Sequence, residues 1–119
     1  MTHEYIRDFC LKKKAVTEEF PFDNETLVFK VMNKMFLLMS LESHPASINV
    51  KCDPELAIEL RDKYPAVSPA YHMNKKHWNS VEVNGTISAA EILKMIDDSY
   101  NLVVKSLPKK IKEQLNHLA

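Results

Sequence analysis

A strict alternation of apolar and polar residues at positions 47–52 places the tightest constraint on the fold. The apolar set is Ile48, Val50 and Cys52, and the polar set is Ser47, Asn49 and Lys51. Side chains of a strand point alternately to the two faces of its sheet, so this pattern predicts a strand with one covered face and one face toward water. Such strands are typical of antiparallel sheets, and we expect helices on one side of this sheet only.

A β-hairpin is predicted immediately before this strand. Two apolar runs, residues 28–32 and 35–39, flank Asn33-Lys34, and asparagine tolerates the positive φ of a tight turn. A two-residue turn there places apolar partners opposite each other on one face: Val31 with Phe36, and Phe29 with Leu38.

The other face of this hairpin would carry three of the six methionines, namely Met32, Met35 and Met39. Methionine is flexible and polarizable, and surfaces rich in it adapt to different partners, although methionine also serves as core filler. One alternative function is therefore a protein-interaction module that uses this exposed sheet face.

Capping signals mark the starts of the helices. Asp53 precedes Pro54, which suits the first helical position, and residues 88–91 (Ser-Ala-Ala-Glu) form a capping box. The predicted helices are a first one over roughly residues 3–13, capped by Thr2, a second from Pro54 to Tyr64, a long one from Ser88 to Leu107, and a short terminal one. With a further strand near residues 17–22, this order predicts a two-layer α+β fold: an antiparallel sheet with helices packed on one face, as a single domain over residues 1–119.

Composition excludes several functional classes. The chain has a single glycine, whereas Walker A and GxGxxG loops need several for close backbone approach to phosphate. Sixteen basic and sixteen acidic residues give no net charge, so nucleic-acid binding must come from a local basic patch. No apolar run has transmembrane length and no signal-peptide pattern opens the chain, so we expect a cytoplasmic protein with reduced cysteines and no membrane contact.

Residues 69–81 concentrate histidine, lysine, asparagine and the only tryptophan. His72 and His77 are five positions apart, which suits neither a helical nor a strand-borne pair of metal ligands, so we expect neither a metal nor a cofactor. No serine or cysteine lies in a nucleophile motif, and we expect no enzyme. A ligand-binding or catalytic site at His72 and His77 stays open as a remote alternative.

A basic hairpin tip is the more natural interpretation of the same stretch. Its arms would be residues 70–73 and 77–83, and the residues expected to touch nucleic acid are His72, Asn74, Lys75, Lys76 and His77. A second basic cluster flanks the Leu107-Pro108 break and contains Lys105, Lys109, Lys110 and Lys112. We therefore expect a small regulatory module that contacts the phosphate backbone of double-stranded DNA.

Residues 64–79 closely resemble the signature of the bacterial MmcQ/YjbR family. The run His-Met-Asn-Lys-Lys-His-Trp at 72–78 is the most specific part, and the similarity extends over nearly all of the chain, including residues 17–22, 28–31, 50–54 and 103–110. The resemblance implies a compact α+β fold similar to the bacterial frataxin-like (CyaY-like) architecture. It also implies DNA binding through a "double wing" of paired hairpins, with Lys75 and Lys76 on one wing and Lys34 on the other.

Overall fold

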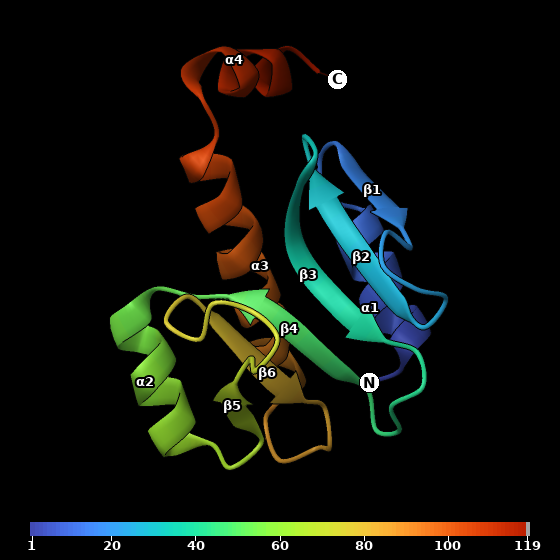
Figure 1. Cartoon of the computed structure of the whole chain (residues 1–119), viewed down its shortest axis with the longest axis vertical. Helices are drawn as coiled ribbons and strands as arrows, with labels where there is room; N and C mark the ends of the chain where they lie inside the picture. The colour runs from blue at the N-terminus through green and yellow to red at the C-terminus, as the bar shows by residue number, and fades with distance from the viewer. Residues whose placement is uncertain (119) are drawn as a thin grey trace.

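One antiparallel sheet of six strands organises the chain, and the computed structural model describes residues 1–118 of it (Figure 1). The strand order is β1-β2-β3-β4-β6-β5. The strands are β1 (Val16–Glu19), β2 (Thr26–Val31), β3 (Lys34–Ser40), β4 (Ser47–Lys51), β5 (Val67–Pro69) and β6 (Trp78–Glu82), and the helices are α1 (His3–Leu11), α2 (Pro54–Lys63), α3 (Ala89–Ser106) and α4 (Lys109–His117). The predicted α+β class is confirmed, and the strand expected near residues 17–22 is β1.

Helices α1 and α3 lie behind the sheet in Figure 1 and cover one of its faces. Their apolar side chains and those of the strands form the main core, which includes Ile6, Phe36, Ile48, Ile92 and Ile96. Helix α2 adds Ala57 and Leu60 to the same core and contacts β5. Among residues 1–118, no helix combines the length and apolar character needed to cross a membrane.

The predicted helix caps are confirmed by side-chain hydrogen bonds. The hydroxyl of Thr2 accepts from the Tyr5 N–H at 3.0 Å, and the Asp53 carboxylate accepts from the Leu56 N–H at 3.2 Å. Ser88 Oγ accepts from the Glu91 N–H at 3.2 Å. Each cap satisfies an N–H group that has no partner within its own helix.

The hairpin between β2 and β3 differs from its predicted register. The turn residues are Met32 and Asn33, with φ of 48° and 68°, one position earlier than expected. Val31 therefore pairs with Lys34, Phe29 pairs with Leu37, and Phe36 is left over as a β-bulge. The predicted pairs Val31–Phe36 and Phe29–Leu38 are wrong.

Packing explains the bulge at Phe36. Its ring lies against that of Tyr100 on α3, with centroids 5.3 Å apart and planes at 88°, so the extra residue adds an aromatic contact to the core. Ser99 Oγ donates to the Phe36 carbonyl and accepts from the Lys51 N–H at 2.8 Å. The buried hydroxyl of Ser99 therefore provides a hydrogen-bond partner for a carbonyl at the bulge and for an N–H of the neighbouring strand β4.

The bulge also removes the predicted methionine face. Met39 is 1% exposed and belongs to the core beneath the helices. Met35 packs on the opposite face of the sheet, and Met32 lies in the turn against the main core. Because the bulge inserts a residue between Met35 and Met39, the three methionines do not share a surface, and the predicted interaction face is wrong.

The other face of the sheet carries a second, smaller core. Val28, Leu38, Ala70 and Trp78 are buried there, and Met35 and Met73 pack against them. Residues 70–77 (yellow in Figure 1) cross in front of the strands and supply part of this cover. The face that the alternation of residues 47–52 predicts to be open is therefore covered over part of its area by a loop.

Candidate nucleic-acid interface

Residues 70–77, hereafter the basic loop, connect β5 to β6. The expected hairpin arm at residues 70–73 is wrong, because these residues form a turn in which the Met73 N–H donates to the Ala70 carbonyl at 3.0 Å. A second turn follows, in which the His77 N–H donates to the Asn74 carbonyl at 3.1 Å. The Asn74 side chain accepts from the Lys76 N–H at 3.0 Å. The segment is thus a compact loop that lies on the sheet, and not an extended strand pair with a projecting tip.

Arg61 on α2 anchors the basic loop, a role that the sequence analysis misses. Its Nε donates to Asn79 Oδ1 at 2.7 Å, and its Nη2 donates to the backbone carbonyl of Lys75. Asn79 is itself 1% exposed and donates to the Ala57 carbonyl at 3.3 Å. One guanidinium therefore holds α2, the start of β6 and the middle of the basic loop together.

The loop presents most of its predicted contact residues to solvent. His72, Asn74, Lys75 and Lys76 are exposed, whereas His77 is half-buried. Lys75 Nζ lies 5.1 Å from the ring centroid of Tyr71, a cation–π distance, and Tyr71 is 68% exposed. Lys76 projects from the next position, so two cations and an aromatic ring occupy one exposed segment.

The two histidines differ in their surroundings. His72 lines a groove, described below, that does not include His77, and the His77 carbonyl accepts from the Cys52 N–H at 2.8 Å. Within residues 1–118, no group of three His, Cys, Asp or Glu side chains is placed to hold a metal ion.

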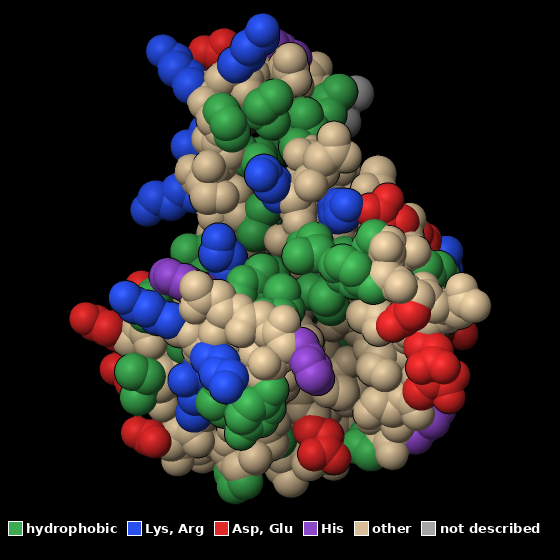
Figure 2. Space-filling view, viewed as in Figure 1, with side chains coloured by type: hydrophobic (Ala, Val, Ile, Leu, Met, Phe, Trp, Pro, Cys, Tyr) green, Lys and Arg blue, Asp and Glu red, His purple; other side chains and the backbone are tan. Residues whose placement is uncertain are grey.

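The second predicted basic cluster lies where α3 passes into α4. Lys105 is in the last turn of α3, and Lys109 and Lys110 are the first residues of α4; all three are exposed. Lys34, exposed, begins β3 beside the hairpin turn. Figure 2 shows Lys and Arg side chains both over the α3–α4 region at the top and over the front of the molecule, whereas Asp and Glu side chains gather along its right edge and also lie along its left and lower edges.

A groove of about 480 Å³ opens on the same face as the basic loop. Its apolar floor consists of Met35, Leu38 and Met73, which belong to the smaller core or pack against it. Its remaining lining residues come from the β1–β2 connection, two strands and the basic loop: Phe22, Asp23, Thr26, Asn49, His72 and Asn74. The groove thus combines an apolar base with a polar rim, as small-molecule sites do.

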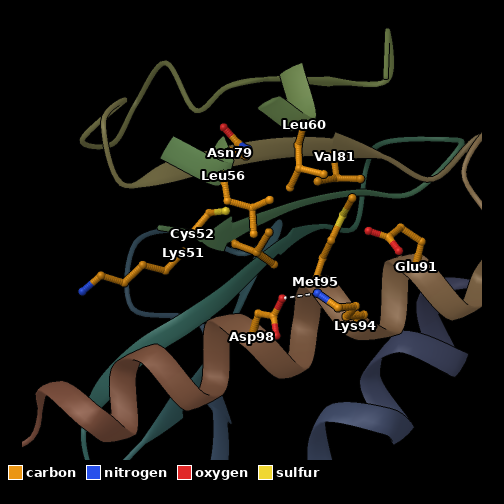
Figure 3. A pocket seen from close by; sticks show the side chains of 11 residues that line it. Lys51, Cys52, Leu56, Leu60, Asn79, Val81, Glu91, Lys94, Met95 and Asp98 are labelled. Atoms are coloured by element: carbon orange, nitrogen blue, oxygen red, sulfur yellow. Dashed lines mark hydrogen bonds and ion pairs between the residues drawn. The ribbon is translucent and has the colours of Figure 1, made fainter. Parts of the chain in front are cut away.

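A second cavity lies on the other side of the sheet, between α2, β4, β6 and α3 (Figure 3). It has a volume of about 30 Å³, enough for one water molecule. Burial, followed by the nearby carboxylates of Asp53 and Asp98, raises the pKa of the Cys52 thiol on its wall to about 11. Burial raises the pKa of Cys10 in the core to about 12, so neither cysteine supplies a thiolate at neutral pH.

The sequence and the structure were both compared with those of known proteins. A family model described as YjbR matches residues 11–102. The uncharacterized protein YbdF of Escherichia coli O157:H7 is 39% identical over 113 residues, covering 95% of this chain and 93% of the relative, and the uncharacterized protein YyaQ of Bacillus subtilis is 34% identical over 116 residues, covering 86% and 98%. Among solved structures, Deinococcus radiodurans protein DR2400, described with a DUF419 domain, superimposes with a TM-score of 0.91 at 38% identity, over 97% of this chain and 88% of that one.

Proposed function

This chain belongs to the YjbR family, and we propose that it is a DNA-binding module without enzymatic activity, which contacts phosphate groups through the basic loop and the α3–α4 junction. Its own residues contribute cations from two segments: Lys75 and Lys76 from the loop, and Lys105, Lys109 and Lys110 from the helices. The two free, buried cysteines suit a reducing cytoplasm, where DNA is accessible.

The observation that carries the proposal is that five exposed lysines, gathered in two segments, form no ion pair within the described part of the chain. The ion pairs formed within residues 1–118 involve Arg7, Lys13, Lys30 and Lys94. None involves Lys75, Lys76 or the α3–α4 lysines, which are nonetheless exposed. A chain with no net charge therefore keeps a set of available cations, and available cations are what phosphate binding requires.

The start of α4 adds a second argument. Lys109 and Lys110 occupy its first turn, which contains no acidic residue and has no side-chain cap. The N-terminus of a helix already carries partial positive charge, so lysines there repel it. A phosphate bound at this junction would relieve that repulsion, since it satisfies free N–H groups and neutralises both lysines.

Anchoring of the basic loop favours this role over simple solubility. Because Arg61 binds the Lys75 carbonyl, the loop backbone is held in place before any ligand arrives. A pre-ordered contact loses less entropy on binding than a mobile one. The exposed Lys34 beside the β2–β3 turn is a further candidate phosphate contact.

Titration of a labelled DNA duplex tests the proposal. The variant Lys75→Gln with Lys76→Gln should bind more weakly than the wild type at low salt. Its matched control, Lys12→Gln with Lys63→Gln, removes the same charge from exposed positions at the ends of α1 and α2 and should bind like the wild type. Equal binding by the two double variants would count against the basic loop as a phosphate contact.

A further inference from the structure

We propose that the groove beside the basic loop receives one unpaired nucleobase, so that single-stranded DNA is the preferred ligand. This inference rests on the proposed DNA binding and adds a base site to its phosphate contacts. It draws on four features of the groove: its floor, its exposed aromatic wall, the hydrogen-bonding groups of its rim and the charges around it.

The floor suits a flat, apolar ring face. Met35, Met73 and Leu38 form it, and methionine sulfur makes favourable contacts with aromatic systems. The volume of about 480 Å³ lies within the range of small-molecule sites. The floor belongs to a packed cluster with Trp78 and Val28, so it does not need a ligand in order to form.

Phe22 supplies the aromatic wall. It is 64% exposed although it is a large apolar residue, and it lines the groove. The adjacent Asp23 carboxylate accepts from the N–H groups of Glu25 at 2.9 Å and Thr26 at 2.7 Å, which fixes the segment that carries the ring. An exposed ring on an ordered turn is a stacking surface, and stacking of bases on aromatic side chains is the usual way to bind single strands.

The rim offers both kinds of hydrogen-bonding group that a base edge needs. Asn49 Oδ1 accepts from Ser80 Oγ at 2.5 Å, and Asn74 Oδ1 accepts from the Lys76 N–H. Each amide oxygen is therefore engaged within residues 1–118, which leaves the amide N–H groups as donors. The Asp23 carboxylate is an acceptor for the N–H groups on base edges, including the ring N–H of thymine.

Charge directs the two parts of a nucleotide to different places. Asp23 in the groove repels phosphate, whereas Lys75 and Lys76 directly follow the groove residue Asn74 in the chain. The base therefore enters the groove while its phosphates lie over the lysines. In a duplex the bases are stacked and paired, and taking one out costs free energy that a single strand does not have to supply.

Phe22→Ala tests the inference with a matched control on the same connection. Phe20 is 48% exposed and lines a separate cavity beside α1, so Phe20→Ala removes a similar ring from outside the groove. The probes are a labelled oligothymidine of about twelve nucleotides, an abasic phosphodiester chain of the same length, and a duplex of that length.

The wild type should bind the oligothymidine about tenfold more tightly than the abasic chain, because one base stacks in the groove. Phe22→Ala should lose most of that difference and bind the abasic chain as the wild type does, whereas Phe20→Ala should retain it. Thermal melting should be unchanged in Phe22→Ala, since the ring is exposed.

Equal binding of oligothymidine by the two phenylalanine variants, or tighter binding of the duplex than of the single strand, would overturn the base site. If Lys75→Gln with Lys76→Gln still weakened binding to every probe, the proposed phosphate binding would stand without the base site. Failure of the wild type to bind any of the three probes would overturn both proposals.

Discussion

Arg61 on α2 donates a hydrogen bond of 2.7 Å from its Nε to Oδ1 of Asn79 on β6, directly beside the basic loop. The amide of Asn79 continues the connection to the Ala57 carbonyl. Together with the packing of Ala70 and Met73 on the smaller core, this pair helps to hold the basic loop in place. Removal of the pair should therefore affect the loop and the stability of the whole chain together.

Asn79→Ala should lower the free energy of unfolding by about 1–3 kcal/mol, because it leaves buried partners of Asn79 without hydrogen bonds. Urea denaturation measures this change. Trypsin should also cleave faster after Lys75 or Lys76, since the loop loses its anchor. The control Asn101→Ala, at an exposed position on α3, should change the unfolding free energy by less than about 0.5 kcal/mol. Equal stabilities for the two variants would mean that the pair does not anchor the loop.

Ser99→Ala should destabilise the protein by about 1–3 kcal/mol. The hydroxyl is fully buried, and without it both the Phe36 carbonyl at the bulge and the Lys51 N–H lose a partner. The exposed Ser106 at the end of α3 provides the matched control, Ser106→Ala. If Ser99→Ala lost no more stability than Ser106→Ala, the Phe36 carbonyl and the Lys51 N–H would have other hydrogen-bond partners.

Met39→Ala should lower the free energy of unfolding by about 2–5 kcal/mol, because it opens a cavity in the core beneath the helices. Met35→Ala should cost much less, since Met35 is only half-buried and packs against the smaller core. Chemical denaturation of both variants measures the difference. If both variants lost a similarly small free energy of unfolding, Met39 would not be packed in the core, and the predicted exposed methionine face would be supported.

Stability should fall as the pH rises above about 9, in part because of Cys10. Burial raises the pKa of this thiol from 9.0 to about 12 in the folded protein. Between these values the unfolded thiol has lost its proton while the folded one retains it, so folding becomes less favourable, by up to about 1.4 kcal/mol per pH unit for this group. Unfolding free energies measured from pH 8 to 11 should decline less steeply for Cys10→Ala than for the wild type. Parallel curves would contradict this assignment.

Features that depend on neighbouring residues could be predicted from the sequence. The caps at Thr2, Asp53 and Ser88 each act on an N–H three residues away. The alternation of residues 47–52 likewise reports only on which face of one strand is covered. These local signals were enough for the α+β class and for the positions of the helices.

Features built from distant residues could not be predicted in this way. The bulge at Phe36 depends on Ser99, which is 63 positions later, and the basic loop depends on Arg61 on a different element. The groove joins Phe22 to His72, which are 50 positions apart in the chain. No periodicity links such pairs, so the covered sheet face, the groove and the role of Arg61 emerge only from the three-dimensional structure.

The salt dependence of DNA binding tests the central claim most directly. Fluorescence anisotropy would measure the dissociation constant of a labelled DNA between about 50 and 200 mM salt. The wild type should lose affinity steeply, and the slope of log affinity against log salt should be smaller by about two for Lys75→Gln with Lys76→Gln, while Lys12→Gln with Lys63→Gln keeps the wild-type slope. No binding by the wild type at the lowest salt, or identical slopes for all three proteins, would contradict the account.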